Sequence, residues 1–312
     1  MTAPTDEPDD ELGGWEPSTV TSRELVDPTP LAAMAALLDD GLSAPAPGEA
    51  LPPLWHWLAL ARWSPSTLLG DDGHARRGGF LPPLDLPRRM FAGGRIEVHA
   101  PLLADTWVRR TSRVESVTPK QGRSGALALV RVSTRLEDER SGELLIVEDQ
   151  DLLFREAAAP AAPSDRSARD QDGTQSLVGA PLTPRETAPG SFAVRTDPAV
   201  LMRFSAASAN THRIHYDRPY ATGVEGYPGL VVHGPLMTLL LAEAWRLQDG
   251  APALVLEHRN LAPLFCGEPA TVRTTEHDAG ARIELVGDAD DSVRVRLDVT
   301  TTDHAARGES TS

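Results

Sequence analysis

The stretch "HGPLMTLLLAEAWRLQDG", residues 233 to 250, combines an apolar helical run with signals for both helix ends. Pro235 falls in the first turn, where its missing N–H costs no hydrogen bond. Gly250 stands where the C-terminal cap of a helix is expected. We therefore predict one long apolar helix over residues 234 to 250.

Four strand patterns follow this helix. The segment "SVRVRLDV", residues 292 to 299, alternates strictly between apolar and polar residues. Such alternation is typical of an antiparallel sheet that has one face in water. An apolar helix packed on such a sheet forms an α+β unit. The predicted strands cover residues 251–260, 268–278, 281–287 and 292–303.

The first part of the chain carries a weak copy of this signature. "LPPLWHWLALA", residues 51 to 61, places Pro-Leu before an apolar run, as residues 233 to 245 do. "HAPLLADTWV", residues 99 to 108, resembles "LAPLFCGEPATV", residues 261 to 272. Because the two similarities occur in the same order, they indicate two copies of one fold.

The first half is therefore expected to contain one helix and several strands. We predict that the helix begins within residues 51 to 61, and that its tryptophans fill the core of this half or wall a tunnel. The tryptophans are Trp55, Trp57 and Trp63, and the strands cover residues 94–102, 106–117, 126–138 and 144–154.

Composition divides the chain into two units. Residues 156–190 are rich in Ala, Pro, Ser and charge and almost free of large apolar residues, which predicts a linker. The units on either side are residues 20–155 and 191–302. The acidic N-terminal residues 1–19 are predicted to be disordered, and residues 303–312 form a tail.

Charge and cysteine content exclude several classes of partner. The formal net charge of -15 argues against nonspecific nucleic-acid binding, which needs a basic surface. No apolar run approaches the roughly 18 residues of a membrane span, so no membrane partner is expected. The single cysteine, Cys266, allows no intramolecular disulfide and suggests a cytoplasmic protein.

Polar residues that carry chemistry gather in "ANTHRIHYDRPYA", residues 209 to 221. His212, His215, Asp217 and the later His233 could in principle bind Fe(II) or Zn. Two arginines lie next to these positions and would oppose a cation. We therefore predict no metal site.

Acid–base chemistry suits the same run. A positioned histidine can take and return a proton near neutral pH, and Asn210 lies five residues before His215, where its amide could hold a water molecule. Gly234 stands where the long helix begins, so its N–H is free and the helix dipole favours a developing negative charge.

These residues resemble a known motif. "SAASANTHRIHYDRPYA", followed by "GYPGLVVHGPL", is similar to the hydratase motif of the MaoC-like hydratases and dehydratases of the hotdog superfamily. The Asn in the first motif position resembles the branch that contains 3-hydroxyacyl-thioester dehydratases and mesaconyl- or itaconyl-CoA hydratases. The resemblance covers about residues 20–155 and 190–302. It implies an α+β fold of two hotdog units, a double hotdog.

The resemblance also implies roles for single residues. His215 falls on the catalytic histidine, and Asn210 falls on a position where the family usually has an aspartate. Since an amide cannot act as a base, His215 is expected to transfer the proton while Asn210 orients the water or hydroxyl. The Gly234 N–H is expected to polarise the thioester carbonyl.

Further residues are candidates for binding or support. Arginines in the connector of the first half could bind CoA phosphates or a substrate carboxylate, because guanidinium groups pair with both. The candidate binding residues are Arg88, Arg89, Arg95 and His233, and the candidate supporting residues are His212, Arg213 and Asp217.

The expected activity is that of a hydro-lyase with one site per chain. It would add water reversibly to a 2-enoyl-CoA or 2-enoyl-ACP, and a short dicarboxylic acyl group such as mesaconyl is one candidate. No cofactor is expected, because CoA or phosphopantetheine serves only as the substrate carrier. A hotdog thioesterase and a non-catalytic acyl-thioester-binding protein are the alternatives. The sequence also leaves room for a homo-oligomer.

Overall fold

The computed structural model describes residues 14–122, 125–156, 179–184, 190–248 and 250–301. Within these residues the strands form one sheet of 11 strands, in the order β1-β3-β4-β5-β2-β8-β11-β10-β9-β7-β6. The first half supplies β1 (Thr19–Leu25), β2 (Arg88–Val98), β3 (Trp107–Gly122), β4 (Gly125–Asp138) and β5 (Leu144–Arg155). The second half supplies β6 (Leu182–Pro184), β7 (Ser191–Val194), β8 (Ala253–Asn260), β9 (Ala270–His277), β10 (Gly280–Gly287) and β11 (Val293–Thr301).

The strands predicted from the sequence are all present, and neighbouring strands are antiparallel. Strand β11 alternates as its sequence indicated, with Val295, Leu297 and Val299 buried on one face. Strand β2 begins six residues earlier than its predicted start at residue 94, because Arg88 to Phe91 also pair with β5.

Strands β2 and β8 join the two halves edge to edge. Gly93 makes this close pairing with β8 feasible, because a Cβ there would lie 2.5 Å from the carbonyl oxygen of His258. Gly94 does the same for the pairing with β5 on the other side, because a Cβ there would lie 2.3 Å from the carbonyl oxygen of Asp149. The register of β2 against β5 shifts between Phe91 and Gly93. The two halves are therefore fused into one sheet.

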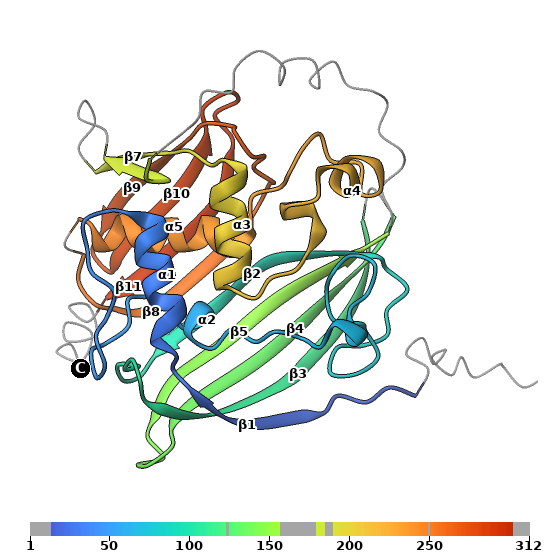
Figure 1. Ribbon diagram of the computed structural model, residues 1–312, viewed down its shortest axis with the longest axis horizontal. Coiled ribbons are helices and arrows are strands. Elements are labelled where there is room, and N and C mark those ends of the chain that lie inside the picture. The colour runs from blue at the N-terminus through green and yellow to red at the C-terminus, as the bar shows by residue number, and fades with distance from the viewer. Residues whose placement is uncertain (1–13, 123–124, 157–178, 185–189, 249, 302–312) are drawn as a thin grey trace, which may run out of the picture.

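The predicted long helix is α5 (Gly234–Arg246), which packs across β2 and β8 to β11 (Figure 1). All residues from Leu236 to Trp245 are buried, as expected for a helix that is apolar on every side. The helix ends at Arg246, with Leu247 as its C-cap, and does not reach Gly250. Gly250 instead packs against the Trp245 ring, where a Cβ would lie 2.2 Å from the nearest ring atom.

The predicted long helix of the first half is wrong. The apolar run forms only the single turn α2 (His56–Ala59). The positive φ of Leu54, 69°, prevents an earlier helix start. Trp55 is buried as predicted, but Trp63 lies beyond the helix and is 64% exposed. The first half therefore has the sheet of a hotdog unit without its long central helix.

Two further helices, α1 (Pro28–Leu38) and α3 (Pro198–Ala207), were not predicted. Each begins with an Asp-Pro pair: Asp27 accepts a hydrogen bond from the N–H of Thr29, and Asp197 accepts one from Val200. Aspartate at the N-cap followed by proline is a strong signal for a helix start. Helices α1 and α3 pack together and connect the halves on the helical side (Figure 1).

The structure shifts two predicted boundaries. Strand β6 lies inside the predicted linker 156–190, and its Leu182 is buried. Trp15, in the segment predicted to be disordered, donates a hydrogen bond of 2.8 Å to the carbonyl of Gly79. Residues 1–13, 157–178 and 185–189 of these two segments lie outside the described residues, as does the tail 303–312. None of the described helices is long and apolar enough to cross a membrane.

Candidate active site

A cavity of about 610 Å³ lies between the two halves. It is lined from both sides, so neither half forms it alone. The polar and aromatic lining residues from the first half include His56, Trp57, His74, Arg89, Phe91 and Glu148. Those from the second half include Asn210, His212, His215, Tyr227, Gly234 and Asn260.

The run of residues 209–221 folds into a short 3-10 turn, η3 (Arg213–His215), followed by helix α4 (Arg218–Gly223). Asp217 caps α4 by accepting a hydrogen bond of 3.1 Å from the N–H of Tyr220. The guanidinium of Arg213 pairs with the same carboxylate at 2.7 Å. Arg213 and Asp217 therefore brace the loop, and neither lines the cavity.

His215 is buried and oriented by one hydrogen bond. Its Nδ1 lies 2.7 Å from the carbonyl oxygen of Val231. Because a carbonyl can only accept, Nδ1 carries the hydrogen and Nε2 keeps its lone pair. Burial, assisted by the nearby His233 and His212, lowers the pKa of His215 well below its usual value. The ring is therefore a neutral base on the cavity wall.

His233 lies behind His215 and does not line the cavity. The two rings stack with centroids 3.6 Å apart and planes 19° apart. His233 is fully buried, and its Nε2 shares a hydrogen bond of 2.8 Å with Ser205 Oγ. Burial lowers the pKa of His233 to about 3. It thus supports the His215 ring as an uncharged neighbour.

Asn210 and Gly234 both line the cavity. Asn210 Oδ1 accepts a hydrogen bond of 3.0 Å from the backbone N–H of His212, which leaves its amide nitrogen as a donor. Gly234 is the first residue of α5, so its N–H has no partner inside the helix. A Cβ on Gly234 would lie 3.2 Å from Phe91 Cδ1 and from Asn260 Oδ1. The site thus offers one side-chain donor and one backbone donor.

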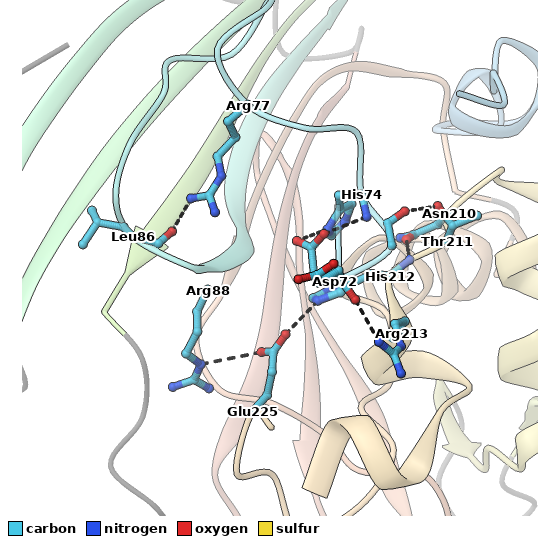
Figure 2. A network of polar contacts seen from close by, with 12 residues as sticks. Asp72, His74, Arg77, Leu86, Arg88, Asn210, Thr211, His212, Arg213 and Glu225 are labelled. Atoms are coloured by element: carbon cyan, nitrogen blue, oxygen red, sulfur yellow. Dashed lines mark hydrogen bonds and ion pairs between the residues drawn. The ribbon is translucent and has the colours of Figure 1, made fainter. Parts of the chain in front are cut away.

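Two functional candidates in the first half, Asp72 and His74, were missed. Asp72 Oδ2 lies 3.2 Å from His74 Nδ1, and the ring of His74 lies 4.2 Å from that of His212. Figure 2 shows this pair beside residues 210–213, part of the candidate catalytic loop of residues 209–217. The pattern Asp-x-His within "GDDGHARRGG" was the available signal, but sequence alone could not place it next to a loop about 140 residues away.

Asp72, His74 and His212 could also hold a metal ion, since their ligand atoms lie within 4.8 Å of one another. This set differs from the one considered from the sequence. His74 Nδ1 already pairs with Asp72, and His212 Nε2 lies 3.0 Å from Glu225 Oε1. Arg88 extends this chain, 3.7 Å from the other Glu225 oxygen (Figure 2). Hydrogen bonds therefore account for the cluster without an ion.

Of the three candidate binding arginines, only Arg89 lines the cavity. Among the described residues, no hydrogen bond or ion pair reaches its guanidinium. Burial lowers the pKa of Arg89 to about 10, so it is charged at neutral pH. Arg88 pairs with Glu225 and lies over the Tyr227 ring. Arg95 is partly exposed on β2, where it pairs with two surface glutamates.

A second polar group lines the first-half side of the cavity. The buried carboxylate of Glu148 accepts hydrogen bonds from Trp57 Nε1 at 2.7 Å and from Gln150 Nε2 at 2.8 Å. His56 Nε2 lies 3.1 Å from its other oxygen. Burial would raise the pKa of Glu148, but these partners, His56 foremost, hold it at about 2. This wall of the cavity is polar rather than an apolar tunnel.

Comparisons with known proteins agree with this geometry. Residues 54–266 match the family model described as hydroxyacyl-thioester dehydratase type 2. The chain is 44% identical over 257 residues to a mesaconyl-C(4)-CoA hydratase from Chloroflexus aurantiacus, covering 81% of this chain and 84% of the relative.

Solved structures show the same fold. A MaoC-like dehydratase from Phytophthora capsici superposes with a TM-score of 0.61 at 16% identity, covering 96% of this chain and 99% of that one. A Mycobacterium tuberculosis protein described as a double hotdog superposes with a TM-score of 0.50 at 15% identity, covering 91% and 95%. The predicted double hotdog is therefore confirmed.

Proposed function

Because the chain belongs to the hydroxyacyl-thioester dehydratase type 2 family and is an acyl-thioester hydratase or dehydratase of the MaoC-like group, we propose that its substrate is a short dicarboxylic 2-enoyl-CoA. The observation that carries this proposal is the unpaired guanidinium of Arg89 in the cavity. The similarity to a hydratase named for mesaconyl-C(4)-CoA supports it.

A buried cation with no hydrogen-bonded partner among the described residues is costly, and a ligand carboxylate removes that cost through two charge-assisted hydrogen bonds. The charge of Arg89 acts on both Asp72 and His74, so Arg89 lies near the histidine cluster. In a mesaconyl-C(4) thioester the free carboxylate is bonded to C3, the carbon that receives water. A carboxylate held by Arg89 would therefore bring C3 to the histidines.

The lining residues support the following steps. The Gly234 N–H donates to the thioester oxygen at the positive end of α5. Asn210 donates to the water, and His215 Nε2 takes one of its protons as the oxygen bonds to C3. The electrons of the double bond move toward the thioester carbonyl and form an enolate. The His215 imidazolium then returns the proton to C2, which completes the hydration, and dehydration follows the same path in reverse.

These steps call for no redox or metal cofactor, so we propose that CoA serves only as the carrier. An acyl-ACP would present the same pantetheine thioester to the site. A cytoplasmic location and a homo-oligomer remain predictions of the sequence.

The substrate assignment can be tested with crotonyl-CoA and mesaconyl-C4-CoA, which differ by the carboxylate, by following loss of the enoyl absorbance. We expect the wild type to prefer mesaconyl-C4-CoA. Arg89→Leu should lower kcat/KM for this substrate by about 10- to 100-fold, the value of a charged hydrogen bond, and leave crotonyl-CoA hydration nearly unchanged. Arg95→Leu, on the same strand but outside the cavity, is the matched control. Equal losses on both substrates would contradict the proposal.

A further inference from the structure

We propose that His74, held by Asp72, is a second catalytic histidine, whose Nε2 accepts a hydrogen bond from the second hydrogen of the water that attacks C3, while that hydrogen stays on the oxygen. This role goes beyond the substrate proposal, because it depends on hydration itself and not on the acyl group. It also gives the first half a direct part in the chemistry.

Both the backbone and the ring of His74 are held by the side chain of Asp72. Asp72 Oδ1 accepts a hydrogen bond of 2.9 Å from the His74 backbone N–H, and Asp72 Oδ2 lies 3.2 Å from His74 Nδ1. With Nδ1 donating to the carboxylate, Nε2 keeps its lone pair. His74 lines the cavity, and no described residue hydrogen-bonds its Nε2.

Four histidine rings lie in a row through the site. The ring of His74 lies 4.2 Å from that of His212, which lies 5.5 Å from His215, which in turn stacks on His233. His212 and His233 use their Nε2 atoms on Glu225 and Ser205. His74 and His215 are therefore the two rings of the row whose Nε2 atoms have no partner among the described residues.

The water itself requires a second acceptor. A water molecule has two hydrogens and two lone pairs; during attack one lone pair points to C3 and one hydrogen to His215. The other lone pair can accept from the Asn210 amide nitrogen, because the amide oxygen is occupied by His212 N–H. One hydrogen remains, and leaving it unbonded in a closed site is costly. His74 Nε2 can accept it.

Electrostatics keep His74 in the accepting form. Burial, together with the charge of Arg89, lowers the pKa of His74 to about 3, so its ring is neutral at neutral pH. Burial would raise the pKa of Asp72, but the hydrogen bonds with the side chain and backbone of His74 hold it below its usual value. An ionised carboxylate behind Nδ1 makes Nε2 a stronger acceptor.

The segment that carries His74 is bonded to the catalytic loop. The Arg213 N–H donates a hydrogen bond of 2.9 Å to the carbonyl of Asp72, and Thr211 Oγ1 donates one to the carbonyl of Gly73 (Figure 2). Arg213 Nη1 reaches the carbonyl of Asp71 at 3.0 Å. The loop that holds Asn210 and His215 therefore also sets the position of His74.

The test compares His74→Phe, which removes the acceptor, with His74→Gln, which retains one. Hydration of crotonyl-CoA and of mesaconyl-C4-CoA is measured for each variant. We expect His74→Phe to lower kcat by about 10- to 100-fold on both substrates, with KM nearly unchanged and His74→Gln recovering much of the rate. His99→Phe, on a partly exposed histidine outside the cavity, is the matched control.

Four results would overturn the role of His74. The first is a wild-type kcat in His74→Phe. The second is an equal loss in the Phe and Gln variants that is accompanied by a lower melting temperature. The third is stoichiometric iron or zinc in the wild type that disappears in His74→Phe. The fourth is a loss confined to mesaconyl-C4-CoA, which would assign His74 to carboxylate binding instead. If the wild type hydrates crotonyl-CoA but not mesaconyl-C4-CoA, the substrate proposal fails, while crotonyl-CoA still tests His74.

Discussion

At the scale of single residues, the local environment separates histidines that the sequence places close together. His215 donates to a backbone carbonyl and faces the cavity with its other nitrogen, whereas His212 bonds to the buried Glu225. Asn210 adds an amide that cannot take a proton. The division of work predicted from the motif, with His215 as the base, is therefore also what these contacts favour.

The role of His215 leads to a direct prediction. His215→Ala should lower kcat by about 10²- to 10⁴-fold on every enoyl-CoA that the wild type hydrates, the usual range for losing a general base. The check is kcat by enoyl absorbance, with circular dichroism to confirm folding. His277→Ala, on an exposed histidine at the end of β9, should behave as the wild type. A folded His215→Ala protein with full activity would exclude this residue as the base.

At the scale of elements, a tight turn of the first half is docked on the catalytic loop. The Gly70 N–H donates a hydrogen bond of 2.7 Å to the carbonyl of His74, and the Gly73 N–H donates one of 3.0 Å to the carbonyl of Gly70. Gly73 has a φ of 88°, and a Cβ there would lie 2.0 Å from the carbonyl oxygen of Thr211. Any side chain at Gly73 must therefore separate the turn from the loop.

Gly73→Ala should consequently reduce activity far more than stability. Gly78→Ala is a matched control, because Gly78 has a similar φ of 93° but an ordinary contact of 3.7 Å to Pro83. Both variants carry the cost of a left-handed alanine, about 1 to 2 kcal/mol, which urea unfolding would measure. We expect a loss of kcat of at least about 10-fold in Gly73→Ala alone, as for a misplaced catalytic group. Equal activity in the two variants would refute this account.

At the scale of the whole molecule, the two halves differ in the length of the helix that packs on the sheet, and the cavity lies where the first half has only a short one. In the second half α5 fills the concave side of the sheet. In the first half α2 is one turn long, and the cavity is lined there by Thr134, Leu136 and Glu148 of the sheet. The second half thus provides the long helix and its N-terminus, and the sheet of the first half provides the volume of the cavity.

Buried neutral histidines also predict how the stability of the whole molecule depends on pH. Burial lowers the pKa of His74 and His233 to about 3 and that of His258 to about 4, from 6.5. Between these values the unfolded chain binds more protons, so stability falls as pH drops below about 6.5, by up to about 1.4 kcal/mol per pH unit for each histidine. Glu243, whose pKa burial raises to about 7, acts in the opposite direction, but it is one group against these three histidines and His215, whose pKa burial also lowers.

Urea unfolding at several pH values between 5 and 8 would measure this effect. We expect the urea concentration at the unfolding midpoint to decrease as the pH is lowered below 6.5. His258→Phe should make this decrease with pH smaller, by the contribution of one histidine. His277→Ala, on an exposed histidine, should leave the slope unchanged. A midpoint that is constant over this range would contradict the prediction.

The sequence by itself determined the elements whose signals are local. The helix at residues 234–246, strands β2 to β5 and β8 to β11, and the motif of Asn210, His215 and Gly234 could be recognised because periodicity, turn residues and motif spacing lie within short windows. Strands β1, β6 and β7 were not predicted. The same local reasoning failed for the run at residues 51–61, where the positive φ of Leu54 delays the helix start and the helix ends after one turn at Ala59.

Only the tertiary structure decided which distant residues meet. It brought Asp72 and His74 to the catalytic loop, placed Arg89 in the cavity and left Arg95 on the surface. Arg89 and Arg95 lie on one strand, but the register of β2 shifts between Phe91 and Gly93, and beyond this point the strand pairs with β8 as well as with β5. No local pattern encodes such an offset, because it arises from how strands of the two halves pair across the molecule.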